Sequence, residues 1–141
     1  MTATMVALHN ALPVRHQYPL PPAQIAENAA AQAGVNGDLK EEERTTATLV
    51  AHFGYGTVVG AGYAALAGKS GLAPIAEGAL YGLAVWGGSY LGLVPAAGLY
   101  RSAVEEPAAR NALMIAAHVV WGSALGLIFH ALTGGDGHNK G

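Results

Sequence analysis

The sequence predicts an all-α protein, a multi-pass transmembrane helical bundle with three full spans and a short N-terminal half-helix. Three features favour this fold: only 11% of the 141 residues are charged, 52% are hydrophobic, and 20 are glycine. Soluble domains carry about a quarter charged residues. The charges are also clustered, so that three long segments contain no Asp, Glu, Lys or Arg. Because a soluble helix needs a polar face, these segments favour membrane spans over the buried helices of a soluble bundle.

The composition excludes several classes of function. A net charge of -2 is too balanced for a nucleic-acid-binding protein, which would show a basic stripe. Without cysteine, the chain has no disulfide framework, thiol nucleophile or Cys-type zinc site. The sequence also lacks the Gly-x-Ser-x-Gly, His-Glu-x-x-His and phosphate-loop motifs. We therefore expect no enzyme, no cofactor and no nucleic-acid partner.

Residues 1–45 are expected to precede the spans. A helix from Met1 to Leu12 would end at Pro13 and reach only ~18 Å, too short to cross a bilayer. This segment also lacks the basic leader and cleavage site of a signal peptide. A second short helix is predicted from Ala23 to Ala33, with proline before it and glycine after it. It is either an interfacial or bundle-packed helix or a plain surface helix, and we expect Val35 to Arg44 to form a solvated acidic loop.

The three spans are expected within residues 46–135. Roughly 20 apolar helical residues cover the ~30 Å hydrocarbon layer of a bilayer. We place the spans at Thr46 to Ala67, Ala73 to Ala97 and Asn111 to Thr133. Residues 136–141 would form a polar tail.

Glycines recur at four-residue spacing within these spans. The first and third spans share a pattern of His, then aromatic-Gly, then Gly, which begins at His52 and again at His118. Such spacing puts glycines on one helix face and lets neighbouring backbones approach closely. We predict that these faces pack helices together, either within the chain or between copies of it. The glycines are Gly56, Gly60, Gly78, Gly82, Gly88, Gly92, Gly122 and Gly126.

These motifs resemble a known family. The residues that carry the resemblance are Gly56, Gly60, Gly62 and Tyr63, then Gly78 to Tyr81, Leu91 to Pro95 and His118 to Trp121, with Leu20-Pro21-Pro22 ahead of them. Over about Pro19 to Leu132, the chain resembles the YagU-like family of bacterial inner-membrane proteins. The resemblance implies a four-helix membrane protein without an established activity, linked at most to survival in acid. Members have a complete first helix, of which this chain resembles only the second half, so we expect a late-assigned start codon or a truncated gene.

Polar side chains within the spans fall at two depths. Counting ~1.5 Å per residue from the span ends gives one layer of His52, His118 and Tyr90, and another of Glu77, His130 and Tyr63, with Lys69 beside the second. Histidine and a buried carboxylate titrate near neutral pH, as a proton-linked switch requires. The plainer interpretation is that the histidines are interhelical hydrogen-bonding groups and that Glu77 caps a helix start. Two histidines at one depth are too few for a metal site.

The basic residues leave the orientation open. Arg15, Lys40, Arg44, Arg101 and Arg110 lie on one side and Lys69 and Lys140 on the other. This distribution favours the first side as cytoplasmic, whereas the family resemblance implies the opposite.

Two functions compete. We expect a non-enzymatic, multi-pass inner-membrane protein packed through glycine faces, either a homo-oligomer or an accessory subunit of a larger membrane complex related to acid stress. The alternative is a proton- or solute-conducting protein that uses His52, His118 and Glu77.

Overall fold

The computed structural model describes residues 21–34 and 40–134, which form helices and turns with no strand among them. The elements are α2 (Pro21–Gln32), α3 (Glu41–Leu66), α4 (Pro74–Gly87), the π-helix η2 (Gly88–Leu93), α5 (Val94–Ala96), the 3₁₀-helix η3 (Ala103–Glu105) and α6 (Ala108–Thr133). The all-α prediction is confirmed for this part of the chain. The predicted helix at Met1 to Leu12 and the tail at residues 136–141 lie outside the described residues.

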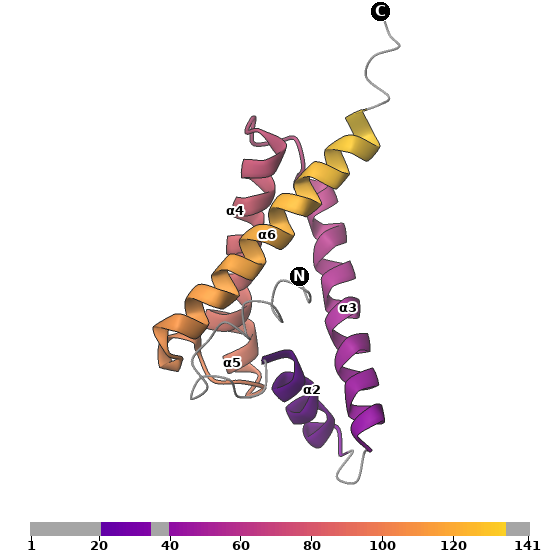
Figure 1. The fold of residues 1–141 in the computed structure, drawn as a ribbon, viewed down its shortest axis with the longest axis vertical. Coiled ribbons are helices and arrows are strands. Elements are labelled where there is room, and N and C mark those ends of the chain that lie inside the picture. Colours follow the sequence, from indigo (N-terminus) through magenta and orange to yellow (C-terminus); the bar gives the residue numbers. More distant parts are fainter. Residues whose placement is uncertain (1–20, 35–39, 135–141) are drawn as a thin grey trace, which may run out of the picture.

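The three long helical segments alternate in direction. Figure 1 shows α4 and α6 crossing each other closely, with α3 beside them and α2 below, next to the start of α3. Helices α3 and α6 run one way and α4 runs the other (Figure 1). The buried Tyr63 of α3 packs edge-on against Tyr81 of α4 and Phe129 of α6, with ring centroids 5.2 and 5.7 Å apart. Aromatic packing therefore joins the C-terminal end of α3 to the α4–α6 pair.

Helix α2 is fastened to the segment that follows α5. Its end is marked by Gly34, whose φ of 77° is the left-handed conformation that glycine adopts readily after a helix. The Asn28 amide donates to the Leu99 carbonyl at 2.7 Å, and the Gln32 amide donates to the Ala97 carbonyl at 3.2 Å. These side chains hold α2 over one end of the bundle.

The acidic segment before the first span is partly helical, and in this respect the loop prediction for Val35 to Arg44 is wrong. Helix α3 begins at Glu41, so that Lys40 alone of the described residues in this predicted loop precedes the helix. The Lys40 backbone N–H donates to the Glu43 carboxylate at 2.8 Å. Carboxylates near a helix N-terminus interact favourably with the helix dipole. The acidic residues thus extend the apolar helix instead of interrupting it.

Two helical segments, Glu42–Leu66 and Ala108–Thr133, are long and apolar enough to cross a membrane. The two helices differ in their surroundings. In the most apolar 18-residue stretch of each helix, 6% of the first is buried within the protein and 33% of the second. The predicted span from Ala73 to Ala97 is helical but divided into stretches of 14, 6 and 3 residues.

A proline accounts for this division. Pro95 has no N–H to donate, and its ring clashes with the carbonyl one turn earlier in an α-helix. The preceding turn widens, and the Val94 N–H bonds to the Ser89 carbonyl five residues back. The π-helix carries Ser89 and Tyr90, both buried.

The hydrophobic core lies where η2, α5, η3 and the first half of α6 meet. Its buried residues are Tyr90, Val94, Tyr100, Ala103, Leu113, Met114 and Ala117, with Ile25, Trp86 and Leu99 packed against them. The core therefore occupies the end of the bundle that α2 covers.

Candidate functional site

Helices α4 and α6 touch through glycine. A methyl group added at Gly78 would overlap the carbonyl oxygen of Gly122, and one at Gly82 would overlap that of His118. From the other side, a methyl group at Gly122 would overlap the Gly78 carbonyl oxygen, and one at Gly126 would overlap that of Pro74. The four glycines let the two backbones approach more closely than any side chain would permit.

The other four glycines that the sequence singles out have open space beside them. At Gly56, Gly60, Gly88 and Gly92, an added methyl group would meet nothing within 4 Å. The structure thus brings together the glycines of α4 and α6 and leaves those of α3 and η2 without a neighbour in the described chain. Whether all eight act in helix packing stays a prediction.

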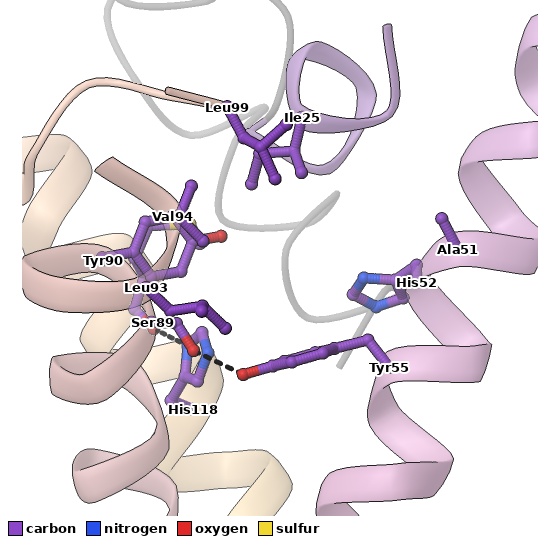
Figure 2. Close-up of a pocket in the computed structure, with 11 residues that line it drawn as sticks. Ile25, Ala51, His52, Tyr55, Ser89, Tyr90, Leu93, Val94, Leu99 and His118 are labelled. Carbon is purple, nitrogen blue, oxygen red and sulfur yellow. Dashed lines mark hydrogen bonds between the residues drawn. The ribbon is translucent and has the colours of Figure 1, made fainter. Parts of the chain in front are cut away.

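A cavity of about 190 Å³ lies between α2, α3, η2 and α6. It is lined by Ile25, Ala51, His52, Tyr55, Ser89, Tyr90, Leu93, Val94, Leu99, Met114 and His118. Figure 2 shows Ile25 and Leu99 together at one end, while His52 projects from α3. His52, Tyr90 and His118, which the sequence places at one depth, therefore line one cavity.

His118 is held in one orientation. Its Nδ1 lies 2.7 Å from the Met114 carbonyl oxygen, and its ring meets that of Tyr90 edge-on at 5.9 Å. The side chain is buried, with 4% of the residue exposed. Because a carbonyl oxygen only accepts hydrogen bonds, Nδ1 carries the proton and Nε2 of the neutral ring is an acceptor. The cavity thus has a fixed hydrogen-bond acceptor in its wall.

Two residues that the sequence did not single out close one side of the cavity. The hydroxyls of Tyr55 and Ser89 lie 2.6 Å apart, and Figure 2 shows the Tyr55 ring reaching across from α3 to meet Ser89. This bond joins α3 to η2. Helix α3 and the π-helix η2 therefore form one wall of the cavity together.

Glu77 lies at the other end of α4, away from this cavity. Its carboxylate accepts hydrogen bonds from the Tyr63 hydroxyl at 3.3 Å, the Gly68 N–H at 2.9 Å and the Ser70 hydroxyl at 2.6 Å. Glu77 is in the first turn of α4, where a carboxylate favours the helix dipole. The carboxylate thus ties the turn between α3 and α4 to both helices.

The remaining members of the second predicted layer do not join Glu77. His130 is exposed in the last turn of α6, and the Lys69 ammonium donates to the Ala65 carbonyl at 2.6 Å. The structure brings Tyr63 and Glu77 together and leaves His130 and Lys69 outside their hydrogen bonds.

A buried ion-pair cluster stands at the start of α6. The Glu106 carboxylate lies 3.2 Å from the Arg110 guanidinium and 3.2 Å from that of Arg101, and accepts the Tyr100 hydroxyl at 2.8 Å. Arg110 is 3% exposed. Burial raises the pKa of Tyr100 to about 12, and the hydrogen bond to Glu106 acts in the same direction. A buried charge needs a partner. This cluster therefore fixes the segment between α5 and α6 against the start of α6.

Sequence reasoning could not find these contacts from spacing alone. Tyr55 lies one turn beyond His52, and residues three positions apart share a helix face. The same reasoning that places His52 toward the other helices could therefore have placed Tyr55 beside it. The Glu106–Arg110 pair has the four-residue spacing of a helical ion pair. Nothing in the sequence pairs Ser89 with Tyr55, because the direction of the Ser89 side chain depends on the π-turn.

No cluster of three or more His, Cys, Asp or Glu that could hold a metal ion occurs within residues 21–34 and 40–134. The cavity instead combines apolar walls with imidazole and hydroxyl groups. This combination suits hydrogen bonding to a small molecule better than metal coordination.

Comparison with known proteins identifies the family but not an activity. No curated protein and no solved structure matches the chain. A family model, described as a protein of unknown function (DUF1440), matches residues 2–127. This match covers almost all of the two helices that are long and apolar enough to cross a membrane, the glycine contact and every described residue that lines the cavity. The chain therefore belongs to the DUF1440 family of proteins of unknown function.

Proposed function

We propose that the chain is a multi-pass protein of the bacterial inner membrane that acts, without catalysis, as a structural subunit of a membrane assembly. The single observation that carries the proposal is the glycine contact between α4 and α6. In lipid, helices associate through close packing, because burying apolar side chains there contributes little to the free energy of association. A contact made of backbone atoms and glycines suits that environment.

The apolar side chains that face away from the protein support the same proposal. Helix α3 exposes Leu49, Val50, Phe53, Val58 and Leu66, and α6 exposes Val120, Leu127, Ile128 and Leu132. Two of these, Val58 and Leu132, are 72% and 76% exposed. Large exposed apolar surfaces are rare on soluble monomers. A bilayer would cover them.

We also propose that the segment formed by α4, η2 and α5 crosses the membrane. Helices α4, η2 and α5 follow one another without a break from Pro74 to Ala96, a length of about 34 Å at 1.5 Å per residue. A π-turn is tolerated within a membrane because its backbone groups remain bonded. Together with α3 and α6, this segment gives three spans of alternating direction.

We further propose that the open glycine faces mediate assembly. Gly56 and Gly60 on α3, and Gly88 and Gly92 on η2, have room for a neighbouring helix. A second copy or another membrane subunit would use them as α4 and α6 use theirs. The motif resemblance to the YagU-like family adds a role in acid stress.

The test of membrane insertion is extraction. Membranes from cells that produce the chain are washed with alkaline carbonate and with urea, and then dissolved in detergent. We expect the protein to remain in the membrane pellet until detergent is added. Release by carbonate or urea would contradict membrane insertion.

The test of assembly uses matched variants. Gly60→Ile fills an open glycine face, whereas Ala61→Ile alters the neighbouring exposed residue of α3. We expect the mass of the complex, measured by light scattering in detergent, to fall for Gly60→Ile and not for Ala61→Ile. Equal masses for both variants would contradict assembly through this face.

The cavity favours a second candidate, conduction of protons or solutes. His52 and His118 line one cavity, as a conduction site would require, whereas Glu77 belongs to the turn at the other end of α4. Proton flux into liposomes that contain the protein tests this candidate. A flux that His52→Gln and His118→Gln abolish would favour conduction, and the absence of flux would exclude it.

A further inference from the structure

We propose that the cavity between α2, α3, η2 and α6 binds a small, uncharged aromatic molecule that carries a hydroxyl or N–H group, as phenols, indoles and quinol head groups do. This inference goes beyond membrane insertion and assembly, since it assigns a ligand site within one chain. It rests on the size of the cavity, the chemistry of its walls and the hydrogen bond that fixes His118.

The size suits one substituted ring. The cavity has a volume of about 190 Å³. A buried apolar cavity of about 150 Å³ is known to bind benzene. The space between α3 and η2 is therefore large enough for a benzene ring with one or two substituents.

The walls favour an uncharged molecule. None of the eleven side chains that line the cavity is Asp, Glu, Lys or Arg. The walls consist mainly of Ile25, Leu93, Val94, Leu99 and Met114, with aromatic rings between them. Burying a charge without a partner is far more costly than burying a neutral group. A charged molecule would lose hydration here, and none of the described side chains in the wall would offset its charge.

The aromatic groups favour a flat ring. Tyr90 and His118 already pack edge-on, with an interplanar angle of 89°, and the ring of Tyr55 reaches across from α3 toward Ser89 (Figure 2). Aromatic rings prefer edge-to-face and offset contacts with one another. The sulfur atom of Met114 adds a polarisable contact for a ring edge.

His118 selects a hydrogen-bond donor. Its Nδ1–H is bonded to Met114 on its own helix, which leaves Nε2 as the acceptor on the far edge of the ring. Within residues 21–34 and 40–134, no side chain or backbone group donates to this nitrogen. The nitrogen is therefore free to accept a hydrogen bond from a molecule that enters the cavity. A ligand hydroxyl or N–H would satisfy it.

His52 provides a second polar contact on the α3 side. Figure 2 shows its ring on α3 and that of His118 on the opposite side of the cavity. A ring with polar groups at both ends, such as a quinol, would meet both imidazoles. A simple phenol or indole would meet His118 alone.

The binding test compares two ligands that differ by one hydroxyl. Para-cresol and toluene are titrated into the purified full chain in detergent micelles, and binding is followed by saturation-transfer NMR. We expect para-cresol to bind about tenfold more tightly than toluene, the effect of one hydrogen bond. In His118→Phe, which keeps a ring but has no acceptor, the two ligands should bind equally. Equal binding in the unaltered protein, or an unchanged preference in His118→Phe, would overturn the proposal.

A second pair of variants distinguishes binding in the cavity from loss of binding by misfolding and from partition of the ligand into micelles. Ala51→Trp places a large side chain in the cavity wall, whereas Ala61→Trp places the same side chain on an exposed part of α3. We expect Ala51→Trp to abolish para-cresol binding and Ala61→Trp to preserve it. Binding that both variants retain would place the ligand elsewhere and overturn the proposal.

The source of the ligand is distinguished in liposomes. One arm adds indole from the aqueous phase, and the other incorporates a quinol with a short isoprenoid tail into the bilayer. Tighter binding of the quinol, weakened by His52→Phe, assigns a lipid-soluble ligand. Tighter binding of indole, unaffected by His52→Phe, assigns a water-soluble one. Binding of neither would overturn the proposal.

Discussion

The hydroxyl of Tyr55 and the hydroxyl of Ser89 lie 2.6 Å apart, joining α3 to the π-helix across 34 positions of sequence. Helix α3 makes few other contacts with α4 and η2, and one of them is the hydrogen bond that the Tyr81 hydroxyl donates to the Val59 carbonyl at 2.6 Å. The Tyr55–Ser89 hydrogen bond holds α3 close to η2 beside the cavity that both residues line.

We expect Tyr55→Phe and Ser89→Ala each to lower the free energy of unfolding by about 1 kcal/mol, because each leaves one hydroxyl unpaired. The double variant should cost less than the sum of the two single variants. Unfolding in mixed detergent micelles measures all three. Strict additivity would show that the two hydroxyls do not interact.

Glycine substitution should have opposite effects at two kinds of position. Gly122→Ala places a methyl group against the backbone of α4 and should destabilise the protein by about 1–3 kcal/mol, as overpacking does. Gly60→Ala meets nothing and should be neutral or stabilising by up to about 1 kcal/mol, because alanine favours helix. Thermal unfolding in detergent compares them. A similar effect of both substitutions would contradict the close contact of α4 and α6.

Glu77→Gln should loosen the turn between α3 and α4. An amide nitrogen cannot accept the hydrogen bonds that the Gly68 N–H and the Ser70 hydroxyl donate to the two carboxylate oxygens. We expect Glu77→Gln to lower the free energy of unfolding, because at least one of these two donors loses its acceptor. Glu42→Gln, on the exposed start of α3, is the control and should stay within about 0.5 kcal/mol. Equal losses would assign the effect to net charge.

Tyr100 should ionise later than an ordinary tyrosine. Its pKa is raised to about 12 by burial and by its hydrogen bond to Glu106, against an ordinary value of 10.0. The neutral hydroxyl therefore stabilises the fold fully below pH 10, and this contribution is lost as the pH rises through about 12. Phenolate absorbance of the unaltered protein minus that of Tyr100→Phe reports this group. A difference that titrates at 10 would contradict the burial of Tyr100.

Much of the helical layout could be predicted from the sequence, because charge-free segments and proline and glycine punctuation are local signals. The sequence predicts the second span, Ala73 to Ala97, as helical, but it does not predict that a π-turn divides this helix. Pro95 weakens the helix, yet neighbouring packing decides whether the chain kinks, widens or ends there. The sequence predicts a loop at the acidic residues that begin α3, because charge alone does not distinguish a solvated loop from a helix N-terminus.

The sequence does not predict which glycine faces have another helix packed against them. Gly56 and Gly60 have the same spacing as Gly78 and Gly82, but only the second pair has a backbone against it in the described chain. Spacing tells which residues share a face, whereas the partner of that face depends on how the helices cross. The same limit applies to Tyr55 and Ser89, whose hydrogen bond requires two helices to meet at one angle.

The most direct test of the three-span topology uses single cysteines, because the chain contains none of its own. Lys40→Cys, Lys69→Cys and Val104→Cys mark the start of α3, the turn before α4 and the connector before α6, and Ile128→Cys marks an exposed apolar position within α6. A membrane-impermeant maleimide is applied to intact cells and to inverted vesicles. Three spans predict that positions 40 and 104 react from one side, that position 69 reacts from the other, and that position 128 reacts only after detergent. Reaction of positions 40, 69 and 104 from one side would contradict the account.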